Sequence, residues 1–96
     1  NCYVHAFQHG DSSWAHQDYM DYSAIVYLNP VSMWDLRKWG GETLFFNEDI
    51  DYVRATTCPK GGSAVVFRGD IFHKVTGVSW EAPYPRNSAT FFFDKK

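Results

Sequence analysis

The sequence predicts an all-β domain, and three features of its 96 residues point to this class. Short apolar segments recur along the chain, turn-forming residues separate them, and aromatic residues make up 19% of the composition. Aromatic and β-branched side chains favour strands, and closely spaced short strands are typical of a sandwich, a barrel or a jelly roll. A chain of this length has room for one hydrophobic core, so we expect a single domain over residues 1–96.

Three of the expected strands lie in the first half of the chain. Cys2–Phe7 alternates between its two faces and is rich in β-forming residues. Ser23–Asn29 is a nearly continuous apolar run, which the turn-forming pair Asn29-Pro30 closes. Thr43–Phe46 follows the turn signal Gly40-Gly41 and is rich in aromatic residues, which favour strands.

Three further strands are expected in the second half, each after a turn signal. They are Ala64–Phe67, His73–Val78 and Ser88–Phe93. The turn signals are Pro59–Gly62, Gly69-Asp70 and Pro83–Pro85. A helix fits only near Val31–Trp39, because no long segment repeats its apolar residues with a period of 3.6.

The composition argues against several classes of protein. Nine Lys and Arg residues against 11 Asp and Glu residues give a net charge of −2, so we expect neither a nucleic acid nor a membrane as partner. No stretch reaches the roughly 18 apolar residues of a membrane span, and no signal-peptide pattern is present. We expect a soluble protein, with the cytoplasm as the favoured location. Cys2 and Cys58 are too few for a disulfide framework, and we expect them not to be joined.

His16 and Asp18 form the first candidate site. On an extended segment, side chains two residues apart point to the same side, so an imidazole and a carboxylate converge there. This pair is two thirds of the facial triad that holds non-haem Fe(II). The alternative is a surface histidine beside a solvated carboxylate. His73, at the start of an apolar strand, supplies the candidate third ligand if it faces the pair across a sandwich, and is otherwise a core histidine.

Arg86 and Ser88 form the second candidate site. They share one face of the last expected strand, where a guanidinium and a hydroxyl together suit a carboxylate ligand. The alternative is an ordinary solvated arginine.

The order of these residues resembles the Fe(II)/2-oxoglutarate-dependent dioxygenase superfamily, specifically its prolyl-4-hydroxylase-like branch. The family pattern H-x-D…H…R/K corresponds to His16, Asp18, His73 and Arg86. The sequence between these residues is similar to the family as well, and the resemblance runs from about Tyr3 to Phe93. It includes Tyr27-Leu28-Asn29, a following Trp with Gly40–Phe45, and His73–Val78.

The resemblance implies a double-stranded β-helix, a jelly roll of two antiparallel sheets. It implies that His16, Asp18 and His73 bind Fe(II) and leave positions for 2-oxoglutarate and O2, with ascorbate as a further cofactor. Arg86, with Ser88 and the Tyr27 hydroxyl, would bind the far carboxylate of 2-oxoglutarate. Collagen-type members have Lys where this chain has Arg86. Related halogenases lack the carboxylate of Asp18, so hydroxylation is favoured over halogenation.

The resemblance implies an enzyme that hydroxylates an unactivated C–H bond with release of succinate and CO2. A prolyl residue of a peptide or protein is the leading substrate, small molecules are the alternative, and the oligomeric state is open. Family members usually carry helices before the jelly roll, so we interpret this chain as a fragment or a minimal version. The rival hypothesis is a non-catalytic jelly-roll binding module with a structural metal, against which Arg86, Ser88 and Tyr27 argue.

Other conspicuous residues are given structural interpretations. Glu42-Thr43 is expected to begin a strand rather than to take part in chemistry. Trp14, just before the metal motif, either shields the iron or packs in the core.

Overall fold

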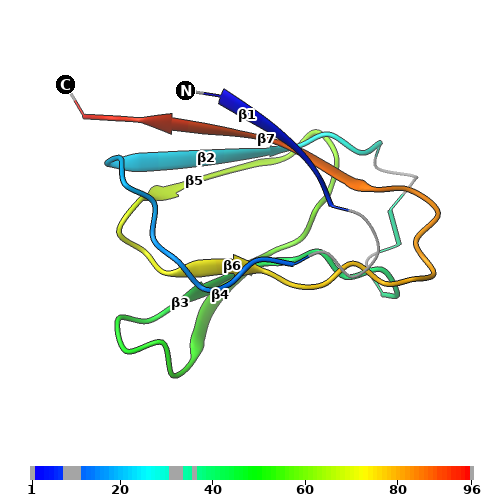
Figure 1. Ribbon diagram of the computed structural model, residues 1–96, viewed down its shortest axis with the longest axis horizontal. Coiled ribbons are helices and arrows are strands. Elements are labelled where there is room, and N and C mark those ends of the chain that lie inside the picture. Colours follow the sequence, from blue (N-terminus) through cyan, green and yellow to red (C-terminus); the bar gives the residue numbers. More distant parts are fainter. Residues whose placement is uncertain (1, 8–11, 31–33, 36, 96) are drawn as a thin grey trace.

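The computed structural model has two antiparallel sheets, stacked as two layers in Figure 1. The larger sheet has the strand order β1-β7-β2-β5 and the smaller sheet the order β4-β3-β6. The strands are β1 (Cys2–Phe7), β2 (Tyr22–Tyr27), β3 (Thr43–Phe46), β4 (Val53–Thr57), β5 (Ala64–Arg68), β6 (His73–Val75) and β7 (Arg86–Phe93). The structure describes residues 2–7, 12–30, 34–35 and 37–95, with only the backbone at positions 2, 5 and 7. The predicted all-β jelly roll of two antiparallel sheets is confirmed.

All six predicted strands are present, although several of their ends differ. The strand expected over His73–Val78 ends at Val75, and the chain then returns to the sheet for one bridge between Gly40 and Val78. In the segment Val31–Trp39, residues 34, 35 and 37–39 form loop and turn rather than helix, and the other four residues lie outside the described part.

Strand β4 is the element that the sequence analysis does not predict. Its residues are Val-Arg-Ala-Thr-Thr, and four of its five side chains are exposed. The strand therefore lacks the apolar alternation that marks a half-buried strand, and it is held by its backbone pairing with β3.

The main core lies between the two sheets. It contains Ile25, Tyr27, Phe45 and Phe67, and the rings of Phe45 and Phe67 meet edge-on with centroids 4.8 Å apart. Because these two rings belong to β3 and β5, they join the small sheet to the large one. Each fully buried side chain of this kind contributes about 1.5–3 kcal/mol to folding.

A second cluster of buried side chains packs the loops beside the sheets. It contains Trp34, Val78 and Ala82, with Trp39 against it. Cys58 carries a free, exposed thiol. The side chain of Cys2 lies outside the described part, so the expectation that the two are not joined stays a prediction. Among the described residues, no helix has the length and apolar character needed to cross a membrane.

Candidate active site

The segment between β1 and β2 lies alongside β6, as Figure 1 shows. His16 and His73 exchange two backbone hydrogen bonds of 3.0 Å. The amide of Ser13 donates to the carbonyl of Val75 at 3.2 Å, and the amide of Asp18 donates to the carbonyl of Gly69 at 2.8 Å. This pairing brings residues 57 positions apart in the sequence side by side, which is what the metal hypothesis requires.

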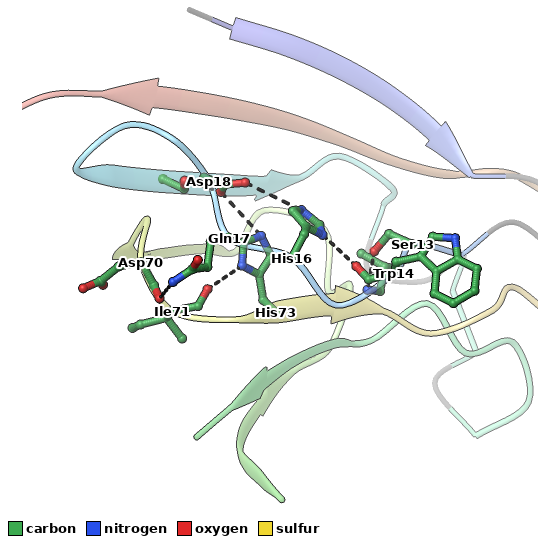
Figure 2. Close-up of polar contacts among 10 residues, drawn as sticks. Ser13, Trp14, His16, Gln17, Asp18, Asp70, Ile71 and His73 are labelled. Carbon is green, nitrogen blue, oxygen red and sulfur yellow. Dashed lines mark hydrogen bonds and ion pairs between the residues drawn. The ribbon is translucent and has the colours of Figure 1, made fainter. Parts of the chain in front are cut away.

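Both imidazoles are oriented by backbone carbonyl groups (Figure 2). Nδ1 of His16 lies 2.7 Å from the carbonyl oxygen of Trp14, and Nδ1 of His73 lies 2.9 Å from that of Ile71. A carbonyl oxygen only accepts, so Nδ1 carries the proton in each ring and the lone pair is on Nε2. In both cases the carbonyl belongs to the residue two positions earlier, so each histidine is oriented by its own strand segment.

Asp18 completes the cluster. One carboxylate oxygen lies 3.6 Å from Nε2 of His16, and the other lies 3.4 Å from Nε2 of His73. One ligand atom from each of the three residues fits within 4.8 Å of the other two. Metal–ligand bonds of about 2.0–2.2 Å place neighbouring ligand atoms about 3 Å apart, so a small movement inward suffices to coordinate one ion.

Ser23 fixes the carboxylate of Asp18 from the neighbouring strand. Its hydroxyl donates a 2.5 Å hydrogen bond to Asp18 Oδ2, and its side chain is completely buried. Partners of this kind orient a metal-binding carboxylate and are worth about 10- to 100-fold in metal affinity. Ser23 occupies an inward position of β2, opposite Phe67 of β5.

The chemistry of these donors fits a divalent first-row metal. Two neutral imidazoles and one carboxylate on one side of an ion form the facial triad typical of non-haem Fe(II). Burial lowers the pKa of His73, while the Ile71 carbonyl and Asp18 act to raise it and His16 to lower it. The lowered pKa favours the neutral form of His73, which is the form that binds a metal.

Arg86 is the largest fully buried polar side chain, with 2% of its surface exposed. Nε donates to the carbonyl of Gly41 at 2.7 Å, and the terminal nitrogens donate to Ser88 Oγ and Thr43 Oγ1 at 3.4 Å. The guanidinium carbon lies 5.2 Å from the centre of the Tyr27 ring. Burial lowers the pKa of Arg86, and Tyr27 and Glu42 act to raise it. A buried guanidinium whose N–H donors are held in fixed directions suits a carboxylate ligand.

Asn29 holds the backbone on both sides of Arg86. Its side-chain amide donates to the carbonyl of Pro85 at 2.9 Å, and its oxygen accepts from the amide of Asn87 at 2.6 Å. Asn29 is 3% exposed, and both bonds are partly buried. The Tyr27-Leu28-Asn29 motif therefore positions the start of β7.

One cavity of about 190 Å³ joins the two groups of residues. His16, Asp18, His73, Arg86 and Ser88 all line it. Apolar side chains supply much of the remaining wall, namely Ile25, Phe67, Val75 and Phe92. The structure thus brings five of the six predicted site residues to one cavity.

Tyr27 is the sixth predicted residue, and it does not line this cavity. Its hydroxyl lies 2.9 Å from Thr43 Oγ1 and 2.7 Å from Thr57 Oγ1. Its ring lies over Arg86. These contacts place Tyr27 behind the guanidinium, as part of its surroundings.

The family model described as "2OG-Fe(II) oxygenase superfamily" matches residues 1–94, almost the whole chain. The chain belongs to the 2OG-Fe(II) oxygenase superfamily. Among solved structures, the chain is similar to a prolyl-4-hydroxylase from Pseudomonas putida, with 26% sequence identity and a TM-score of 0.77. The match covers 99% of the present chain and 51% of the Pseudomonas chain, so the present chain spans about half the length of that enzyme. No curated protein sequence matches the chain.

Two residues of the candidate site are not predicted from the sequence. Ser23 is a polar residue at an inward position of an otherwise apolar strand, and that exception is the signal that could have revealed it. Thr43 was interpreted only as the start of a strand, yet it is fully buried and contacts both Arg86 and Tyr27.

The position of Trp14 supports neither of its two interpretations. Its side chain is 90% exposed, so it does not pack in the core. Its carbonyl, rather than its ring, contacts the metal cluster through His16.

Proposed function

We propose that this chain is the catalytic core of an Fe(II)- and 2-oxoglutarate-dependent dioxygenase that hydroxylates an unactivated C–H bond. The observation that carries the proposal is the single cavity lined both by the His16–Asp18–His73 cluster and by the buried Arg86. A structural metal site alone gives no reason for a buried guanidinium on the same cavity.

The residues have separate tasks in this proposal. His16, Asp18 and His73 would hold Fe(II), and Arg86 with Ser88 would bind the far carboxylate of 2-oxoglutarate. Iron(II) bound there supplies the activation of dioxygen, coupled to conversion of 2-oxoglutarate to succinate and CO2, with one oxygen atom entering succinate and the other the product hydroxyl. Ile25, Phe67 and Val75 would supply an apolar wall beside the reacting groups.

We propose a prolyl residue of a peptide or protein as the substrate. The support is the similarity to a Pseudomonas putida prolyl-4-hydroxylase over nearly all of the present chain. His16 is 46% exposed at its side chain, whereas His73 is 6% exposed, so the cluster is accessible from the His16 side. Small-molecule substrates are the alternative outcome. Ascorbate as a further cofactor and a cytoplasmic location stay predictions.

The first test is binding. Under anaerobic conditions, Fe(II) and 2-oxoglutarate together should raise the melting temperature more than either does alone, because 2-oxoglutarate binds through the metal as well as through Arg86. His73→Ala should abolish the metal-dependent part of the shift. A metal shift without any added effect of 2-oxoglutarate would favour the non-catalytic binding module.

The second test is turnover. Succinate release is measured in air with Fe(II), 2-oxoglutarate and ascorbate against a panel of prolyl peptides, matched peptides with alanine in place of proline, and small metabolites. Release that depends on the prolyl residue, with a mass increase of one oxygen in the peptide, supports the proposed substrate. Release driven by a small molecule would retain the dioxygenase and overturn the prolyl substrate. Binding of both ligands with no succinate release from any substrate would count against catalysis by this core.

A further inference from the structure

A hydrogen-bonded support lies behind Arg86, on the side of Gly41. The Gly41 carbonyl accepts a hydrogen bond of 2.7 Å from Nε, shorter than the 3.4 Å bonds to Ser88 and Thr43. The orientation of the Arg86 guanidinium therefore depends on the orientation of this carbonyl. Gly41 has φ +81°, and a Cβ at this position would lie 2.7 Å from Arg86 Cδ. Glycine is needed here for both reasons.

Thr76 fixes the backbone that carries this carbonyl. Its hydroxyl oxygen accepts hydrogen bonds of 3.0 Å from the amides of both Gly41 and Glu42. The same hydroxyl donates a 2.6 Å bond to the carboxylate of Glu42, and the Thr76 amide donates to the Glu42 carbonyl at 2.9 Å. One threonine side chain thus uses its full hydrogen-bonding capacity on two consecutive residues.

Thr76 comes three residues after His73, on the same stretch of chain. Beyond the end of β6, this stretch still pairs with the segment before β3 through Thr76–Glu42 and Gly40–Val78. Thr76 itself does not line the cavity. It is therefore linked to His73 along the chain and to Arg86 through Gly41, but it does not line the cavity.

We propose that Thr76 is a positioning residue for 2-oxoglutarate, acting through the Gly41 carbonyl on the direction of the Arg86 guanidinium. The inference rests on the proposed function, since it concerns the affinity for the far carboxylate of that cosubstrate. Thr76→Val removes the hydroxyl while keeping the shape and β-branching of the side chain. It should weaken 2-oxoglutarate binding about three- to tenfold, because the hydrogen bonds of the hydroxyl to Gly41 and Glu42 are lost and the Gly41 carbonyl is held less firmly.

The experiment measures dissociation constants by anaerobic titration of the Fe(II)-loaded protein. Two ligands are compared: 2-oxoglutarate and 2-oxopentanoate, which has the same carbon chain but lacks the far carboxylate. Thr76→Val should weaken the first and leave the second unchanged within about twofold, because only the first reaches Arg86. Thr76→Ser, which keeps the hydroxyl, should restore wild-type affinity. Thr56→Val, at an exposed position of β4, is the matched control.

A double variant tests whether Thr76 acts through Arg86. In an Arg86→Lys background the guanidinium that donates to the Gly41 carbonyl is absent. Adding Thr76→Val should therefore weaken 2-oxoglutarate binding no further. Additive losses, or equal losses for both ligands, would overturn the proposal and assign Thr76 a general structural role. Thr76→Ala, which removes the same hydroxyl, is the second variant if Thr76→Val folds poorly, and it should show the same selective loss.

Failure of the inference and failure of the proposed function give different results. If the wild type binds 2-oxoglutarate no better than 2-oxopentanoate, the far carboxylate has no site and the proposed cosubstrate is wrong. If the wild type discriminates and Thr76→Val discriminates equally well, the cosubstrate is retained and the role of Thr76 is wrong.

Discussion

Both faces of the large sheet depart from the usual pattern, although the inner face also holds the core residues Ile25, Tyr27 and Phe67. The inner face carries buried polar side chains, among them Ser23, Arg86 and Ser88, each with 2% or less of its surface exposed. The outer face carries exposed apolar side chains, which include Val4 (72%), Val66 (63%), Phe93 (42%) and Phe91 (40%). In most soluble sheets the apolar face is buried and the polar face is solvated.

The buried polar side chains agree with the proposed function, in which part of the inner face binds ligands. Burying a polar group costs free energy unless it is hydrogen-bonded, and each of these inner groups has such bonds to its neighbours. The buried hydroxyls and the guanidinium lie where the metal and a carboxylate would bind. The outer face needs no ligand, and its exposed apolar side chains contribute little to folding because water still reaches them.

The largest expected effect comes from the arginine on the inner face. Arg86→Ala should weaken 2-oxoglutarate binding about 30- to 1,000-fold, because a bidentate contact in a desolvated pocket contributes about 2–4 kcal/mol. Fe(II) affinity should barely change, and Arg86→Lys should fall between. The measurement is a titration of 2-oxoglutarate into the anaerobic Fe(II)-loaded protein, followed by its metal-to-ligand absorption band.

Arg68 supplies the control for this prediction. It lies on β5 with an exposed side chain paired to Asp70, on the opposite face of the same sheet. Arg68→Ala should leave the affinity unchanged. Equal affinities for wild type, Arg86→Ala and Arg86→Lys would mean that Arg86 does not bind the cosubstrate.

The second effect concerns Ser23, which faces inward beside the metal cluster. Ser23→Ala removes the hydrogen bond to Asp18 and should weaken Fe(II) binding about 10- to 100-fold, because the carboxylate loses its fixed orientation. Anaerobic calorimetric titration with Fe(II) measures this directly. The adjacent outward position provides the control, since Ala24→Ser adds a hydroxyl on the other face and should not change metal affinity. An unchanged Fe(II) affinity in Ser23→Ala would argue that Asp18 is positioned by other contacts.

A third effect separates stability from binding on the inner face. Tyr27→Phe removes a hydroxyl that contacts Thr43 and Thr57, and should lower the free energy of unfolding by about 1–3 kcal/mol. Urea denaturation of the metal-free protein is the measurement, with Tyr52→Phe, at a 59% exposed residue, as the control. Affinity for 2-oxoglutarate should fall less than in Arg86→Ala. A fall as large would show that the Tyr27 hydroxyl itself binds the cosubstrate.

The smallest effect is expected on the outer face. Val66→Thr should change the free energy of unfolding by no more than about 0.5 kcal/mol, because the side chain is 63% exposed. Binding of a hydrophobic dye to the native protein should decrease in the same variant, because the substitution interrupts the exposed apolar surface. A loss above about 1.5 kcal/mol would show that this face is packed in solution and would remove the contrast between the two faces.

The sequence by itself located six of the seven described strands and predicted most of the residues of the candidate site. Turn residues and short apolar runs located six strands, and the spacing of His16, Asp18, His73 and Arg86 predicted residues that the structure brings to one cavity. These features are local or depend on residue type, so they can be read along the chain. Strand β4 could not be found in this way, because its exposed side chains carry no pattern and only its pairing with β3 defines it.

The tertiary structure alone decided which side of each strand faces the core. In β7, successive side chains point to opposite faces of the sheet. Polarity alone would place the face with Ala89, Phe91 and Phe93 inside and the face with Ser88 and Thr90 outside. The structure places Ser88 and Thr90 on the cavity and leaves Phe91 and Phe93 exposed. A strand can present either face to its partner sheet, and the choice depends on contacts from residues distant in sequence. Here the small sheet supplies those contacts, with His73 beside Asp18 and the Gly41 carbonyl on Arg86.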